Sequence, residues 1–95
     1  MKKYKSNVTG DLVEAVQWDG SGAPPSPAPE TSGIAIIKWV RETSSEPDGG
    51  VTRNAIHLPH GKRAFPLDFI VKESGGFKVY TPEVFATEFT EWQHA

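Results

Sequence analysis

Five basic or imidazole side chains lie close together in the middle of the sequence and are the residues best suited to chemistry. They are Arg53, His57, His60, Lys62 and Arg63. Pro59-His60-Gly61 between them is typical of a turn, so an antiparallel hairpin would gather these side chains at one end. Arginine and backbone amides at such a tip can hold a phosphate group. We predict an anion-binding site here. The alternative is a solvated turn whose charges keep an edge strand soluble.

The spacing His57-x-x-His60 also raises the question of a metal site. Zinc requires three or four ligands in a closed geometry. The chain contains no cysteine, its third histidine is His94, and no carboxylate lies near the pair in sequence. We therefore expect no metal and no cofactor.

Candidate catalytic residues lack the partners that catalysis requires. Glu83, Glu88 and Glu91 follow one another near the carboxyl terminus, where surface carboxylates usually serve solvation, and an acid-base pair needs a second group in a cleft. Ser44 and Ser45 lie in a polar stretch with no histidine pattern nearby, so a nucleophilic triad has no support. We expect that the protein is not an enzyme.

The large aromatic residues are expected to fill the core, because a short chain needs bulky side chains to bury enough apolar area. They include Trp18, Trp39 and Tyr4. Tyr80 would point away from the face that Phe77 shares, so it or Trp92 could remain exposed. An exposed aromatic residue beside Arg63 would suit base stacking or contact with a partner protein.

Length and charge limit the class of protein. A chain of 95 residues fits one domain, here residues 1–95. This length is near the lower limit for a core that is stable without disulfides or bound metals. The net charge of −2 offers no broad attraction to nucleic acid or membranes, so direct DNA binding is not expected. Neither a signal peptide nor a membrane span is apparent, which favours a soluble intracellular protein.

The first half of the chain predicts one strand and one helix. Apolar residues on both faces of 12–18 indicate a central strand. Residues 20–33 form a Pro/Gly-rich loop. A helix should run from about 33 to 42, capped by Thr31 or Ser32, with a wide apolar face that lies across a sheet. The polar stretch 43–50 is a loop by composition.

The second half predicts a strand over 51–58, a return strand over 62–65, and a hairpin of 69–72 and 77–81 around Ser74-Gly75-Gly76. Thr81-Pro82-Glu83 is a good helix start, and we expect a helical turn over 82–86. A terminal strand over about 88–92 is favoured by β propensity, although the spacing of Phe85, Phe89 and Trp92 leaves helix open. The fold class is α+β: a small, mostly antiparallel sheet of four to six strands, one helix packed across it, and a short carboxyl-terminal helical turn.

Several short motifs follow one another in a distinctive order. They are Val13-Glu14-Ala15-Val16-Gln17-Trp18, Pro66-Leu67-Asp68-Phe69-Ile70-Val71-Lys72, Gly76-Phe77-Lys78-Val79-Tyr80, and Pro82 through Phe85 to Phe89. This order resembles a family of small, uncharacterised proteins of bacteriophage and prophage genomes. Members of that family typically have glycine where this chain has Leu67, so the leucine argues against a turn that needs a positive φ at that position. The resemblance covers about two thirds of the chain and implies no catalytic residues.

The resemblance implies a phage origin and action in the cytoplasm of an infected bacterium. We expect a non-catalytic accessory protein that acts by binding a host protein, as an inhibitor or against host defence. One alternative is an oligomeric protein that sequesters a nucleotide-type anionic ligand, and another is a structural or assembly component of the virion. Small size favours a homo-oligomer modestly in each case.

Overall fold

The computed structural model of the protein describes residues 1–22 and 29–92. Five antiparallel strands form the large sheet in the order β7-β6-β2-β1-β8. Their bounds are Lys2–Ser6 for β1, Leu12–Gln17 for β2, Phe69–Glu73 for β6, Gly76–Tyr80 for β7 and Phe89–Glu91 for β8. A small antiparallel sheet contains β3 (Gly50–Val51), β4 (Ile56–His57) and β5 (Arg63–Ala64), with a 3₁₀ turn at Pro59–Gly61 between the last two. The α+β prediction is confirmed.

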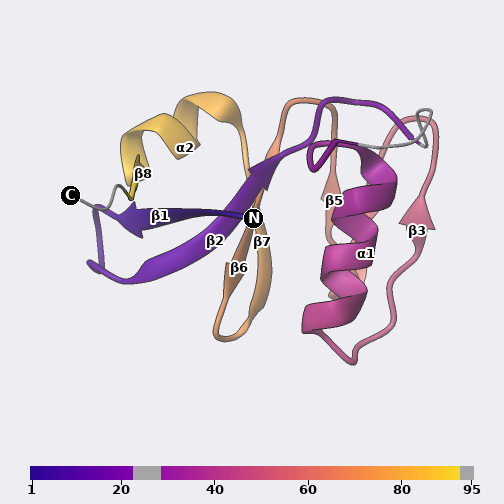
Figure 1. Ribbon diagram of the computed structural model, residues 1–95, viewed down its shortest axis with the longest axis horizontal. Coiled ribbons are helices and arrows are strands. Elements are labelled where there is room, and N and C mark those ends of the chain that lie inside the picture. The colour runs from indigo at the N-terminus through magenta and orange to yellow at the C-terminus, as the bar shows by residue number, and fades with distance from the viewer. Residues whose placement is uncertain (23–28, 93–95) are drawn as a thin grey trace.

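Two helices lie on different parts of the large sheet. Helix α1 (Gly33–Thr43) lies with the small sheet at one end of the molecule, and α2 (Pro82–Glu88) lies with β8 at the other (Figure 1). Ser32 caps α1 by accepting a hydrogen bond from the Ala35 amide, whereas the Thr31 hydroxyl donates to Asp19 instead. Thr81 caps α2, and Pro82 occupies its first turn as expected.

The two faces of the large sheet bury separate apolar clusters. On the first face, α1 and the small sheet enclose a cluster that contains Trp18, Ile36, Val40, Ile56 and Ile70, all fully buried. On the second face, α2 covers Ala15, Val71, Phe85 and Phe89 together with partly buried aromatic rings. Because strand side chains alternate, neighbouring residues of β2 and β6 serve opposite clusters.

The hairpin and the end of the chain agree with prediction. Strands β6 and β7 pair from Phe69 with Tyr80 to Glu73 with Gly76. Strand β2 lies in the middle of the sheet, as its two apolar faces predicted. Helix α2 continues to Glu88 before β8 begins at Phe89, so the terminal segment is a strand that follows a slightly longer helix. Part of the loop predicted over 20–33 lies outside the described residues.

One predicted strand is wrong, and one observed strand was not predicted. Residues 51–58 do not form one strand, because Thr52 bonds the Ala55 carbonyl through both its amide and its hydroxyl and reverses the chain between β3 and β4. Strand β1 was not anticipated, since three of its five residues are lysines and only Tyr4 is large and apolar, so no apolar alternation marks it.

The turn over residues 65–68 differs from the prediction made for Leu67. Leu67 has a φ of 74°, a region that leucine rarely adopts. Its amide donates to the Trp18 carbonyl, and its carbonyl accepts from the Gln17 side chain. Asp68 closes the turn by bonding Phe65 through both its amide and its carboxylate. These hydrogen bonds hold the leucine in a conformation that glycine would adopt more readily.

Candidate functional site

A groove with a basic lining separates the small sheet from the edge of the large sheet. It has a volume of about 490 Å³ and is lined by Lys62, Arg63, Lys78, Val79 and Tyr80. We call it the basic groove. Lys62 directly precedes β5, Arg63 is the first residue of β5, and the other three come from β7.

Buried contacts fix the position of the two walls. Ala64 of β5 and Phe77 of β7 belong to the same buried cluster, so the strands are anchored immediately beside the groove. Lys62 crosses between them, and its Nζ donates to the Phe77 carbonyl oxygen at 2.7 Å. The groove therefore lies between two elements that are held together by a common core.

The lining carries three cations and no carboxylate. The Lys78 ammonium is paired at 3.3 Å with Glu73, which lies outside the lining. Lys62 bonds a neutral carbonyl, and within the described residues no carboxylate pairs with it. Arg63 is exposed, and within the described residues no ion pair neutralises it. The groove therefore presents positive charge on a protein whose net charge is negative.

Tyr80 contributes an aromatic surface that is fixed from the opposite side. Its ring contacts those of Phe85 and Phe89, with centroids 6.4 and 5.2 Å away. Its hydroxyl donates to Glu73 at 3.3 Å. Burial and the nearby Glu73 carboxylate raise the pKa of Tyr80 above its usual value, so the phenol stays neutral and remains a donor.

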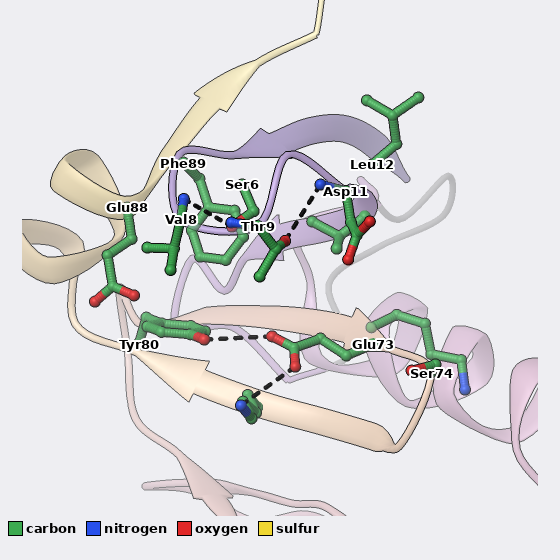
Figure 2. A pocket seen from close by; sticks show the side chains of 13 residues that line it. Ser6, Val8, Thr9, Asp11, Leu12, Glu73, Ser74, Tyr80, Glu88 and Phe89 are labelled. Carbon is green, nitrogen blue, oxygen red and sulfur yellow. Dashed lines mark hydrogen bonds and ion pairs between the residues drawn. The ribbon is translucent and has the colours of Figure 1, made fainter.

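A second hollow adjoins the groove on the face covered by α2. Figure 2 shows Val8, Thr9 and Asp11 of the β1–β2 turn facing Tyr80 and Glu73 across it. The hollow has a volume of about 460 Å³ and shares Lys78 and Tyr80 with the basic groove. Within residues 1–22 and 29–92, no group of three or more histidine, aspartate or glutamate side chains could hold a metal ion.

The structure divides the predicted anion-binding set. Lys62 and Arg63 line the basic groove with Tyr80, which the sequence had assigned to partner contact. His60 points elsewhere and pairs with Glu46. His57 lies 3.3 Å from the Thr52 hydroxyl, and its strand pairs it with Arg63 by register.

Two further predicted residues lie apart from the groove. Arg53 lines a different hollow, together with Ile34 and Val51 at the side of α1. Trp92 follows β8, is 38% exposed, and donates its amide to the Lys3 carbonyl. Sequence reasoning missed Lys78, although its place between Phe77 and Val79 on the second strand of the predicted hairpin was a usable signal.

Comparison with protein-family models, curated proteins and solved structures finds no match to this chain. The resemblance to phage proteins therefore stays a prediction from the sequence motifs. No helix within the described part of the chain has the length and apolar character to cross a membrane.

Proposed function

We propose that this protein acts by binding an anionic partner in the basic groove and does not catalyse a reaction. The observation that carries this proposal is the convergence of Lys62, Arg63 and Lys78 on one groove whose lining has no carboxylate. The resemblance to phage proteins suggests a protein of the infected bacterium as the partner, which would be inhibited by occupation of its acidic surface.

The charge of the groove accounts for selectivity better than for tight binding. Exposed ion pairs each contribute about 0–1 kcal/mol, so three cations alone give weak affinity. They raise the association rate for acidic partners and repel basic ones. Affinity would come from the apolar walls, where Val79 and the ring of Tyr80 can exclude water from the contact.

A nucleotide-type anion is the second candidate ligand. It is favoured by the position of Tyr80 in the same groove as Arg63, since an aromatic ring can stack on a base while a guanidinium binds phosphate. The half-buried ring would offer only part of its surface to a base.

The test compares two double variants with equal charge change. Isotope-labelled protein is titrated with a glutamate-rich peptide and with ATP, and amide shifts are followed by NMR. Arg63→Ala with Lys78→Ala should abolish shifts at 62–63 and 78–80, and binding should weaken as salt is raised. Arg53→Ala with Lys38→Ala is the control, since both residues are exposed and lie outside the groove.

Equal loss of binding in both double variants would contradict the proposal, because general charge and not the groove would then be responsible. Binding of ATP but not of the peptide would select the second candidate.

A further inference from the structure

Strand β7 is an open edge of the large sheet and forms one wall of the basic groove. Among the described residues, β6 is the one strand that pairs with it. An edge strand presents unpaired amides and carbonyls that can template another chain. The edge is therefore a second binding feature beside the cationic side chains.

The hairpin register shows which residues of β7 turn their backbone outward. Ser74 and Gly75 connect Glu73 to Gly76, which face each other as the closing pair. Antiparallel pairs alternate between bonded and non-bonded, so Phe77 and Val79 should point their amides and carbonyls away from β6. The position of Lys62, whose Nζ bonds the Phe77 carbonyl from outside the sheet, agrees with this alternation.

The backbone groups of Phe77 and Val79 differ in whether they are free to pair with an incoming strand. Lys62 covers the carbonyl of Phe77, whose side chain is buried. Val79 lines the groove, and within the described residues no hydrogen bond outside the sheet occupies its amide or carbonyl. An incoming strand would therefore pair with β7 around Val79.

Charge decides which strand would fit. The side chains around this edge are Lys62, Arg63 and Lys78, so a basic segment would be repelled and an acidic one attracted. Residues of an added strand alternate between the two faces of the sheet. Carboxylates could thus meet Lys78 on one face and the Lys62 and Arg63 pair on the other.

We propose that the partner binds as an extended acidic segment that adds a strand to β7 at Val79. This inference rests on the proposed function and specifies the partner's chemistry and conformation. Backbone hydrogen bonds would supply affinity and the basic side chains would supply selectivity, as in other cases of strand addition. A second copy of this chain is a poorer occupant, because pairing of β7 with β7 of another copy would bring the same cations, Arg63 and Lys78, of both copies to one contact, where they repel.

The test uses the full chain and two synthetic peptides. Both alternate glutamate and valine over seven residues. One of them carries an N-methyl group on every peptide amide, which removes the backbone donors of both edges but leaves the charge. The unmodified peptide should bind and protect the Val79 amide from hydrogen exchange. The affinity of the N-methylated peptide should be lower by a factor of about ten or more, which is the loss expected for one or two hydrogen bonds.

The outcomes separate this inference from the proposed function. Suppose that the two peptides bind with equal affinity and that the double variant Arg63→Ala with Lys78→Ala binds neither. This result would overturn strand addition and leave anion binding in place. If neither peptide bound, both strand addition and the proposed function would be overturned. An unprotected Val79 amide in the complex, or self-association of the protein alone through this edge, would also overturn strand addition.

Discussion

The two faces of the large sheet are covered in different ways. The first face is buried under an eleven-residue helix and a second sheet, and its cluster is mainly aliphatic, with the rings of Trp18, Trp39 and Phe77. The second face is closed by α2, a seven-residue helix, through stacked and edge-on rings. The Phe85 ring lies parallel to that of Phe69 at 3.8 Å and is stacked on that of Phe89 at 4.8 Å.

This difference indicates that the first face stabilises the whole fold, whereas the second face can open locally. A cluster that joins a helix and two sheets ties distant segments together, so its loss should unfold the whole chain. A short helix held by a few rings can open locally, because isolated helices of this length have little stability of their own. Helix α2 also borders the hollow beside the basic groove through Glu88 at its end.

The largest effect is expected at Trp18, on the first face. Its side chain is fully buried, and its indole nitrogen donates to the Ser21 carbonyl at 2.7 Å. Trp18→Ala should lower the free energy of unfolding by about 3–5 kcal/mol through the cavity left behind. Chemical denaturation measures the loss. Trp92→Ala is the matched control, since that tryptophan is 38% exposed and should cost clearly less.

A smaller effect is expected at Phe85, on the second face. Phe85→Ala should cost about 3 kcal/mol, because the residue is buried and contacts four other rings. Hydrogen exchange should show faster opening of α2 and β8, while β2 and β6 keep their protection. Uniform loss of protection along the chain would show instead that the two faces unfold as one unit.

The sequence predicted the elements whose pattern is local. The central strand, the α1 helix, the β6–β7 hairpin and the Thr81-Pro82 helix start all follow from alternation, periodicity or turn chemistry within a few residues. Strand β1 was missed because it pairs on both sides yet contains three lysines and a single large apolar residue, Tyr4, so its sequence shows no apolar alternation.

The basic groove depended on contacts that sequence spacing does not contain. Arg63 and Lys78 are fifteen residues apart and meet because Ala64 and Phe77 share a core. His60 does not line the groove and pairs with Glu46, which lies in the loop after α1. Tertiary contacts thus selected which members of a charged stretch face one another.

A stabilising change is expected in the turn that precedes β6, the strand that contributes side chains to both clusters. Leu67 has φ 74° and is 56% exposed, so its side chain contributes little burial in return for backbone strain. Leu67→Gly should raise the free energy of unfolding by up to about 1 kcal/mol, since relief of strain outweighs the added freedom of the unfolded chain. Thermal denaturation measures the change. Leu67→Ala is the control, because alanine retains the strain, and a stabilising alanine would contradict this explanation.

The smallest effects are expected from pH, and they should differ in sign between the two faces. In the layer over the first face, hydrogen bonds from Arg41 lower the pKa of Asp48 below its usual 3.8. The stability from this contact is present above that value and is lost as pH falls through the lowered pKa. On the second face, burial raises the pKa of Tyr80 above its usual 10.0, so its contribution is lost as pH rises through the raised value.

Two conservative variants separate these contributions. Asp48→Asn should lower the melting temperature at neutral pH and converge on the parent protein in strong acid. Tyr80→Phe should resist alkali better than the parent, because it has no phenol to ionise. The Asp48 contact should contribute less than about 1 kcal/mol, since the Arg41 side chain is 61% exposed. If Asp48→Asn stayed equally destabilised in acid, the Arg41 contact would depend on shape and hydrogen bonding rather than charge, and the contrast between the faces would be one of packing alone.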